Sequence, residues 1–425
     1  MGAEPLPQAS MRALAEEVEI VFTEQHDGSV RDPTRGYGPP LRRILMLSWE
    51  YPPRVVGGIA AHVDGLARAM ARAGHDVVVF SLDHPKVGDD EMMEGVRVLR
   101  ANADLPWLPD DYLVATMASA NHQLTQLAAR LGSWRPQVIH AHDWLVAWTA
   151  DTLKTLWGVP LVATIHGTER GRHGGYVPQG TPAAINAVEW WLTFQAQQVI
   201  ACSKFMVREV TDGFELDSEK VNLVPNGIDT GQWHSPTPRS PTGREPLVVA
   251  WGRIQYEKGF QVLTRAIGHL RHRLPDIRCV IAGRGTYLAE LQTQIDMEGV
   301  GDLVRLAGFV PDDELRQLLQ RTGCVVIPSL YEPFGIVALE GMAAGAPTIV
   351  ARTGGLAEIV EGTGAGVLFE PGNHVALANC IADVLSHPEV ADRMRTKAAS
   401  LLAGRYTWDA IAATTLGVYN KAKRG

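Results

Sequence analysis

The sequence predicts an α/β protein with two doubly wound, Rossmann-like domains that face each other across a cleft. Three observations lead to this prediction. Short apolar strands alternate with amphipathic helical segments along most of the chain. This series runs twice, and a proline-rich stretch separates the two runs. The length of 425 residues is enough for two or three domains of ordinary size.

The composition excludes several classes of protein. With 46% hydrophobic and 20% charged residues, the chain can build sizeable cores, which excludes disorder over most of its length. A net charge of −8 excludes a globally basic surface of the kind that binds DNA or anionic lipid. No apolar run approaches the roughly 20 residues that a membrane-spanning helix needs.

The cysteines and the start of the chain indicate a reducing, cytoplasmic setting. No two cysteines form a Cys-x-x-Cys pair, and none lies near histidines at zinc spacing, so neither disulfides nor structural zinc is expected. Residues 1–41 lack the basic start and apolar core of a secretory signal. The four cysteines are Cys202, Cys279, Cys324 and Cys380.

The first domain is predicted over residues 42–235, after an N-terminal extension over residues 1–41 in which residues 11–22 form one short element. A strand at 44–47 leads into Gly57 and Gly58, and a helix with an apolar stripe follows and ends near Gly74. Further β-branched or apolar runs predict strands at 77–80, 138–140, 161–165 and 199–201. Such runs between amphipathic helices are typical of a parallel sheet covered on both faces.

Four prolines predict an interdomain linker at residues 236–246. The second domain is predicted over residues 247–405, with strands at 247–250, 278–282, 304–306, 324–327 and 348–350. The last segment, 406–425, is expected to be helical and to cross back onto the first domain. In sheets of this kind ligands bind beyond the carboxyl ends of the strands.

The strongest chemical motif runs from Glu332 to Glu340. It follows an apolar strand and contains a glycine turn before a helical pattern. Gly335 allows a close approach of backbone to ligand, and the N–H groups of Gly335, Ile336 and Val337 at the helix start favour an anion. Two carboxylates at this spacing can hold opposite ends of one nucleotide sugar, whereas alone they would equally suit a solvated loop and helix.

A second motif places Arg253 and Lys258 in a loop bounded by Gly252 and Gly259, directly after a strand. A planar guanidinium and a point charge five residues apart can converge on one diphosphate. The alternative is a charged surface loop. Arg284, after the next predicted strand, is a further candidate for donor binding.

The first domain offers its own candidates at strand ends. Gly57 and Gly58 open a helix and can cradle a phosphate with backbone N–H groups, although many turns use such a pair. His166 follows the strand that ends at residue 165 and can hydrogen-bond a sugar hydroxyl; a satisfied core histidine is the alternative.

Another cluster follows the strand at 138–140. His140 and His142 share one strand face, but no third ligand is evident, so no metal site is expected. His142, Asp143, Trp144 and Arg170 are weaker candidates for acceptor binding. The tryptophans offer flat faces for sugar stacking, or else pack in the core; they are Trp144, Trp148, Trp157, Trp190 and Trp191.

As a set, these motifs resemble the retaining glycosyltransferases of family 4, which have the GT-B fold. The resemblance covers about residues 42–420 and includes residues 225–229 (Pro-Asn-Gly-Ile-Asp) and 352–356 (Arg-Thr-Gly-Gly-Leu). The stretch 138–144 and the run Ser-Trp-Glu-Tyr-Pro-Pro at 48–53 further resemble bacterial glycogen and starch synthases. The nearest likeness is to actinobacterial α-1,4-glucosyltransferases of glycogen and methylglucose lipopolysaccharide synthesis.

The resemblance implies a role for each motif. Arg253 and Lys258 would bind the donor diphosphate, Glu340 the ribose, and Glu332 the donor sugar, while His166 would touch that sugar near its 6-hydroxyl. UDP-glucose or ADP-glucose would be the substrate, with no cofactor, and an α-glucan or glucan-lipid the acceptor. Many glycogen synthases have lysine where this chain has Val55, which puts strict use of ADP-glucose in doubt.

The same resemblance favours substitution on one face of the anomeric carbon, because the motifs imply no carboxylate nucleophile. Four other functions stay open at this point: a lipid-directed mannosyltransferase, a maltose-1-phosphate synthase, a nucleotide-sugar 2-epimerase and a non-catalytic carbohydrate-binding scaffold. A lipid-directed enzyme would want a basic, apolar patch on the first domain, and an epimerase its own acid–base carboxylates. A scaffold would have no need of the intact donor set.

Overall fold

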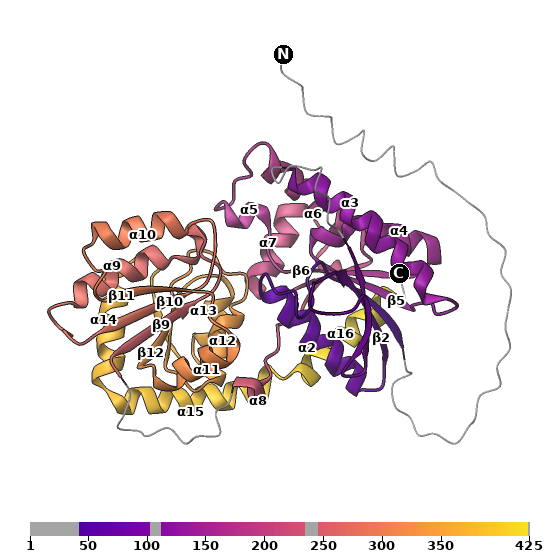
Figure 1. The fold of residues 1–425 in the computed structure, drawn as a ribbon. Helices are drawn as coiled ribbons and strands as arrows, with labels where there is room; N and C mark the ends of the chain where they lie inside the picture. The colour runs from indigo at the N-terminus through magenta and orange to yellow at the C-terminus, as the bar shows by residue number, and fades with distance from the viewer. Residues whose placement is uncertain (1–41, 103–111, 234–244, 424–425) are drawn as a thin grey trace, which may run out of the picture. The chain divides into compact units, whose positions relative to one another are not determined.

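A computed structural model describes residues 42–102, 112–233 and 245–423. Within these ranges the chain forms two largely parallel sheets, each covered by helices on both faces (Figure 1). The prediction of a doubly wound α/β fold is confirmed. The extension 1–41, with its expected element at 11–22, and most of the linker 236–246 lie outside the described residues.

The first sheet has eight strands in the order β3-β4-β2-β1-β5-β6-β7-β8, and only the β3–β4 pairing is antiparallel. Its strands are β1 (Arg43–Leu47), β2 (Asp76–Leu82), β3 (Asp90–Met93), β4 (Val96–Ala101), β5 (Val138–His142), β6 (Leu161–Ile165), β7 (Gln198–Ala201) and β8 (Val221–Leu223). Its helices are α2 (Gly58–Arg72), α3 (Leu113–Gln126), α4 (Ala147–Trp157), α5 (Glu169–Arg172), α6 (Thr181–Gln195), α7 (Lys204–Phe214) and α8 (Thr230–Trp233), with short 3₁₀ turns at Leu127–Leu131, Trp144–Val146 and Ser218–Lys220.

The second sheet has six parallel strands in the order β11-β10-β9-β12-β13-β14. Its strands are β9 (Leu247–Trp251), β10 (Arg278–Ala282), β11 (Val304–Gly308), β12 (Cys324–Ile327), β13 (Thr348–Ala351) and β14 (Val367–Phe369). The helices that follow them are α9 (Phe260–Leu270), α10 (Leu288–Met297), α11 (Asp312–Arg321), α12 (Ile336–Ala343), α13 (Gly354–Val360), α14 (His374–Ser386) and α15 (Pro388–Arg405), with a 3₁₀ turn at Tyr256–Lys258. The last helix, α16, spans Trp408–Ala422.

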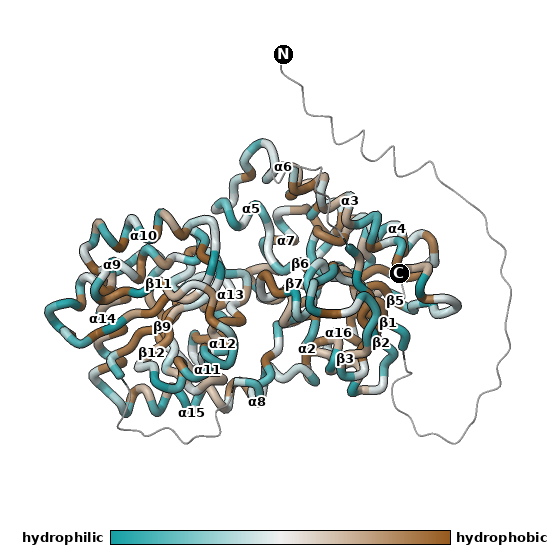
Figure 2. Tube along the Cα trace, viewed as in Figure 1, coloured by the Kyte–Doolittle hydropathy of each residue, from teal (hydrophilic) through white to brown (hydrophobic). Residues whose placement is uncertain are grey.

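The apolar strands are buried on both faces because successive side chains point to opposite sides of a sheet. In β1, Ile44 and Met46 pack in the layer of α2 and α16, whereas Leu45 and Leu47 pack in the layer of α3 and α4. Figure 2 shows hydrophobic residues concentrated on the strands and hydrophilic residues on the outer parts of the helices. Within the described ranges, no helix is both long enough and apolar enough to span a bilayer.

The helix α16 packs against α2 and against strands β6 and β7 of the first sheet. Trp408, its first residue, lies against Gly227, where a β-carbon would come within 2.6 Å of the Trp408 ring. The next residue, Ile228, donates its backbone N–H to the carbonyl oxygen of Tyr406 at 2.8 Å. The segment 225–229 therefore lies where the chain returns from the second sheet to the first.

Candidate active site

The candidate residues follow strands that are neighbours in each sheet. In the first sheet β1, β5 and β6 lie side by side, and they lead into Glu50, Asp143 and His166 respectively. In the second sheet β9 and β12 are adjacent and lead into the loops that carry Arg253 and Glu332. Because parallel strands end at the same edge, each sheet gathers its candidates at one edge.

Lys258 and Glu332 form an ion pair within the second sheet's loops. The Lys258 Nζ lies 2.9 Å from Glu332 Oε2, and the side chains are 20% and 12% exposed. The hydroxyl of Ser329 donates to the same carboxylate oxygen at 3.1 Å. Two motifs 74 residues apart therefore meet in one charge pair, and Lys258 is not an isolated cation before a ligand arrives.

The loop before α13 supports the backbone of Glu332. Gly354 has φ +47°, and a β-carbon there would lie 2.0 Å from the Glu332 carbonyl oxygen. The N–H of Gly355 donates to that same oxygen at 3.0 Å. The Thr-Gly-Gly sequence at 353–355 is thus required by a close backbone approach, which fixes the position of the Glu332 main chain.

Glu340 lies on α12, just over one turn after the helix begins at Ile336. Its Oε2 accepts a hydrogen bond from the Trp251 indole Nε1–H at 3.0 Å. Burial raises the Glu340 pKa to about 7, and the hydrogen bond from Trp251 only partly opposes this. Gly335, with φ +107°, caps the helix N-terminus, where Ile336 and Val337 carry N–H groups that have no acceptor within the helix.

The glycine pair of the first domain faces the second. A β-carbon on Gly57 would lie 3.9 Å from the Arg253 Nε, and one on Gly58 would lie 3.1 Å from the Ile336 Cδ1. The pair therefore lies opposite both donor motifs. A larger residue at Gly58 would push against Ile336.

Glu50 is a site residue for which the sequence reasoning assigned no role. Its buried carboxylate accepts the N–H of Gly57 at 2.9 Å and also that of Val56. Burial raises the Glu50 pKa, and the backbone N–H bonds and the charge of Arg253 oppose that rise. Without a ligand, the Gly57 N–H is therefore already bound by Glu50, and phosphate binding by the glycine pair stays a prediction.

His166 is held by Asp143 and by a second histidine. The His166 backbone N–H donates to Asp143 Oδ1 at 2.7 Å, and its ring Nε2 lies 3.2 Å from the His142 Nδ1. Asp143 is buried and adopts φ +61°, which is unusual for a residue with a side chain. Burial lowers the His166 pKa to about 3, so the ring is neutral near pH 7.

The loop around Glu332 is also bound to the first domain. The Ser203 hydroxyl donates to the Pro333 carbonyl oxygen at 2.7 Å, and the Thr168 N–H donates to the Tyr331 hydroxyl at 3.3 Å. Glu358 accepts the N–H groups of Lys204 and Phe205 at the start of α7, at 2.9 and 2.7 Å. These contacts place Tyr331 against the loop that follows His166 and Pro333 against the start of α7.

The remaining candidates lie away from this group or are buried. His142, Asp143 and Trp144 are all less than 7% exposed. Arg170 lines a cleft of about 760 Å³. The Arg284 guanidinium lies 5.6 Å from the Phe309 ring centroid, and the backbone oxygen of Arg284 accepts the Ile254 N–H. The other four candidate tryptophans pack, partly buried, against the first domain's core: Trp148, Trp157, Trp190 and Trp191.

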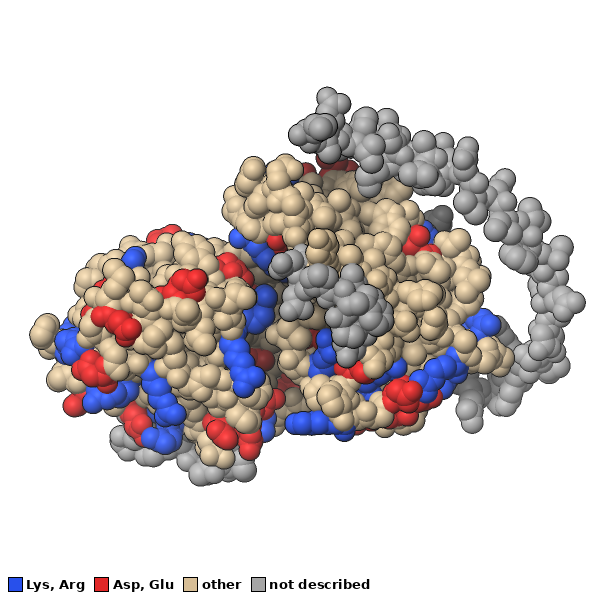
Figure 3. All heavy atoms as spheres, turned by 45° about the horizontal axis from the view of Figure 1, so that its top comes forward, with Lys and Arg blue, Asp and Glu red and all other residues tan. Residues whose placement is uncertain are grey.

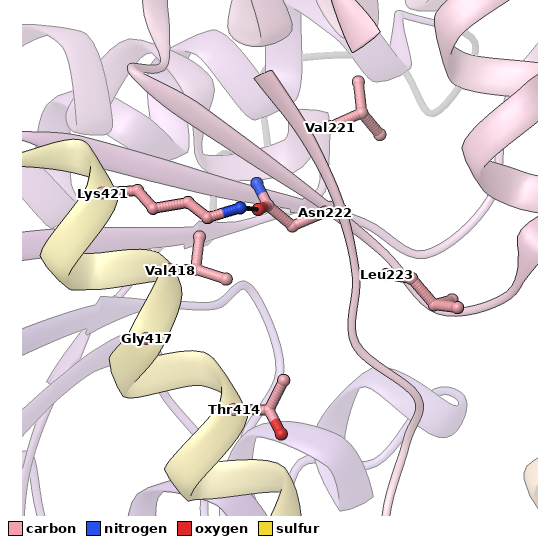
Figure 4. Close-up of a pocket in the computed structure, with 7 residues that line it drawn as sticks. All are labelled: Val221, Asn222, Leu223, Thr414, Gly417, Val418 and Lys421. Atoms are coloured by element: carbon pink, nitrogen blue, oxygen red, sulfur yellow. Dashed lines mark hydrogen bonds between the residues drawn. The ribbon is translucent and has the colours of Figure 1, made fainter. Parts of the chain in front are cut away.

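Two further surface features lie outside this group. A cavity of about 390 Å³ between β8 and α16 is crossed by a hydrogen bond from Lys421 Nζ to Asn222 Oδ1 at 2.8 Å (Figure 4). It contains none of the residues singled out above. On the face shown in Figure 3, positive and negative side chains are interspersed.

His62 is the other site residue that the sequence reasoning missed. Spacing alone offered no third ligand beside His140 and His142, but the structure brings His62 of α2 and His166 to His142. Nothing in the local sequence around His62 marks it, because it lies on the inner face of an ordinary amphipathic helix.

Comparisons with known proteins identify the family. Residues 56–232 match the model described as glycosyltransferase family 4, and residues 235–401 match glycosyl transferases group 1. A glycogen synthase of Mycobacterium tuberculosis is 39% identical over 402 residues, which is 90% of this chain and 95% of that protein. An uncharacterized glycosyltransferase of Methanocaldococcus jannaschii is 36% identical, covering 89% and 98% of the two chains.

A more distant relative, an α-maltose-1-phosphate synthase of Mycobacterium tuberculosis, is 28% identical, covering 89% and 99% of the two chains. Among solved structures, sucrose-phosphate synthase of Thermosynechococcus elongatus has a TM-score of 0.75 at 23% identity, covering 90% and 99%. The catalytic domain of Arabidopsis thaliana starch synthase IV, bound to ADP and acarbose, has a TM-score of 0.72 at 17% identity, covering 91% and 100%. The chain therefore belongs to the glycosyltransferases of the GT-B fold and is a hexosyltransferase.

Proposed function

We propose that this enzyme transfers glucose from UDP-glucose or ADP-glucose to an α-1,4-glucan, free or lipid-linked, with retention of configuration. The observation that carries the donor half is that the cationic motif and the Glu332–Glu340 motif lie together opposite the glycine pair. Arg253 lies against Gly57, and Lys258 pairs with Glu332 beside it in the second domain. Two cations suit a diphosphate leaving group. The likeness to a glycogen synthase supports glucose and a glucan as donor sugar and acceptor.

In this proposal the second domain binds the donor from both ends. Glu340, beside Trp251, accepts the ribose hydroxyls, and Arg253 with Lys258 stabilises charge on the departing diphosphate. Glu332 holds the hexose, whose hydroxyl groups replace part of its contact with Lys258. Neutral His166 hydrogen-bonds a sugar hydroxyl from the first domain, and closing the cleft around the donor excludes water.

The state of the carboxylates supports same-face substitution. Glu50 is bound to backbone N–H groups, Asp143 to the His166 N–H, and Glu332 to Lys258 and Ser329. A nucleophile for double displacement would have to leave such partners and reach the far face of the anomeric carbon. We therefore propose that the leaving diphosphate accepts the acceptor's proton while protein charges hold the oxocarbenium-like pair together.

One observation favours a second candidate, transfer to a phosphorylated sugar. The 760 Å³ cleft is lined by Arg170, Arg172 and His173, although Glu209 and Glu257 line it too. A sugar phosphate would suit the cations, and the maltose-1-phosphate synthase relative makes this class a useful comparison. A neutral glucan suits the mixed charge of the cleft better, so it stays the first proposal.

The test offers UDP-glucose, ADP-glucose and GDP-mannose, each with malto-oligosaccharides or with glucose 1-phosphate. Hexose steps on the oligosaccharides should appear by mass spectrometry, and an α-1,4-specific amylase should digest them. Transfer only to glucose 1-phosphate would establish the second candidate, and transfer only of mannose would contradict both. We expect the reaction in the cytoplasm, and we expect it to need no metal ion, since Arg253 and Lys258 supply two positive charges.

A further inference from the structure

Four histidine rings form a buried cluster behind the proposed donor site. His62 comes from α2, His140 and His142 from β5, and His166 from the loop after β6. Ring centroids lie 4.1 Å apart for His140 and His142, 4.7 Å for His62 and His166, and 5.3 Å for His62 and His142. His166 is the most exposed of the four and lies between the cluster and the cleft.

The hydrogen bonds separate the satisfied ring of His140 from the rings of His62 and His142, which carry nitrogens without partners. His140 uses both nitrogens, at 2.8 Å to the Tyr419 hydroxyl and 2.7 Å to the Thr164 hydroxyl. In contrast, both nitrogens of His62 and the Nε2 of His142 are buried without a hydrogen-bond partner among the described residues. A buried polar atom without a partner costs about 1–3 kcal/mol, so a group of such atoms on adjacent rings favours a missing ligand.

Asn226 accounts for part of this. Its side chain lies within hydrogen-bonding reach of His62, so it can satisfy one nitrogen of that ring. The other nitrogen of His62 and the Nε2 of His142 remain without a protein partner in the part of the chain that the structure describes.

The geometry is that of a three-histidine metal site. One nitrogen each from His62, His142 and His166 can be chosen so that all three lie within 4.8 Å of one another. In a tetrahedral zinc site with Zn–N bonds of about 2.0–2.1 Å, ligand nitrogens lie about 3.4 Å apart. The 3.2 Å between His142 Nδ1 and His166 Nε2 already meets this, and a nitrogen of His62 lies within 4.8 Å of a nitrogen on each of the other two rings.

The ligand types also suit a zinc-class metal. Asp143, next to His142 in sequence, is a buried carboxyl group that accepts the His166 backbone N–H and so fixes the position of this ligand. Three imidazoles favour zinc, copper, cobalt or nickel over magnesium or calcium.

We propose that His62, His142 and His166 bind one zinc-class divalent ion, which glucosyl transfer does not require. One nitrogen of each ring would be a ligand, and a water molecule would complete a tetrahedral site. The second nitrogen of His166 would stay free, so the site is tested by metal binding itself rather than by activity.

Metal binding is measured on the full chain after removal of metals with a chelator and of the chelator by dialysis. We expect one equivalent of Zn²⁺ in competition with a chromophoric chelator, and a visible Co²⁺ absorption band typical of tetrahedral nitrogen coordination. Replacing His62 with glutamine should weaken Zn²⁺ binding by at least about tenfold and remove the Co²⁺ band. Far-UV circular dichroism checks that the variant folds, and His62→Asn is the substitute if it does not.

The matched control is His374→Gln, which removes one ring of the exposed pair in which His269 Nε2 lies 2.9 Å from His374 Nδ1. This variant should leave the Zn²⁺ affinity and the Co²⁺ band unchanged. Loss of binding in His374→Gln but not in His62→Gln, or no Co²⁺ band in the wild type, would overturn the site.

Discussion

Replacing Glu332 with glutamine tests how the charge of Lys258 is shared between protein and donor. In the structure Lys258 Nζ lies 2.9 Å from Glu332 Oε2. A diphosphate must compete with this carboxylate for Lys258 and is itself repelled by it. Glutamine keeps the shape of the side chain and removes its charge, so free UDP or ADP should bind the variant more tightly, while glucosyl transfer should fall.

The size of the effect follows from the ion pair. At 2.9 Å and an effective dielectric constant of about 20, the Coulomb attraction is about 6 kcal/mol. Desolvation offsets much of this, since only 20% and 12% of the two side chains are exposed, and the glutamine amide still contacts Lys258. We expect a surplus of about 1 kcal/mol, or roughly fivefold tighter nucleotide binding. Turnover should fall by about 10²–10³, because the contact with the hexose is lost.

Calorimetry with UDP and with ADP measures the effect on the wild type, Glu332→Gln, Lys258→Met and the double variant. In the Lys258→Met background the Glu332 substitution should no longer tighten nucleotide binding, because the competition for Lys258 is gone. Thermal unfolding checks that each variant is folded. Weaker nucleotide binding in Glu332→Gln, equal to that of Glu340→Ala, would refute the reasoning and place both carboxylates at the nucleotide end of the donor.

Three other outcomes are expected. Arg253→Ala should lower kcat by about 10²–10³ in steady-state assays, because leaving-group charge peaks in the transition state; a raised KM with unchanged kcat would mean that Arg253 only docks the donor. Burial raises the Glu340 pKa from 4.5 to about 7, so between these pH values the folded protein keeps a proton that the unfolded protein has released. The free energy of unfolding should therefore fall as the pH rises from about 4.5 to 7. Affinity for the free nucleoside should rise from about pH 6 to 8 as Glu340 ionises, and Glu340→Gln should flatten both dependences in calorimetry and thermal unfolding. Glucosyl transfer should survive excess EDTA followed by dialysis. A loss of activity that only Mg²⁺ or Mn²⁺ restores would contradict the proposal that Arg253 and Lys258 supply the positive charge for the diphosphate.

The strands and the donor motifs could be predicted because their signals are local. β-Branched runs such as that of β9 predict buried parallel strands, and Arg253 and Glu332 follow such runs directly. The strands that the sequence reasoning missed are short or carry charges. In β4, for example, Arg100 is fully buried and pairs with Glu91 of β3, so charged residues stand where an apolar pattern would be expected.

The pairings inside the site could not be predicted, because they join residues that are distant in sequence. Nothing near Lys258 shows that Glu332 is its partner, and nothing near Gly57 shows that Glu50 accepts its N–H. His62 has the spacing of a helix residue that faces a core, and only the fold brings its ring beside His166. Local motifs therefore supply candidate residues, whereas the fold decides which of their charges are already paired.

This division of charge bears on the order of events at the site. Before a donor arrives, Lys258 is balanced by Glu332, while Arg253 lies near the buried carboxylates of Glu50 and Asp143, whose pKa values it lowers. Burial still keeps the pKa of Asp143 at about 6. In the proposed donor site, a diphosphate that binds both cations would take Lys258 from Glu332 and free that carboxylate for the hexose attached to the same phosphate. We therefore expect the donor's two ends to bind cooperatively, and a free sugar to gain little at Glu332 until a diphosphate has occupied Lys258.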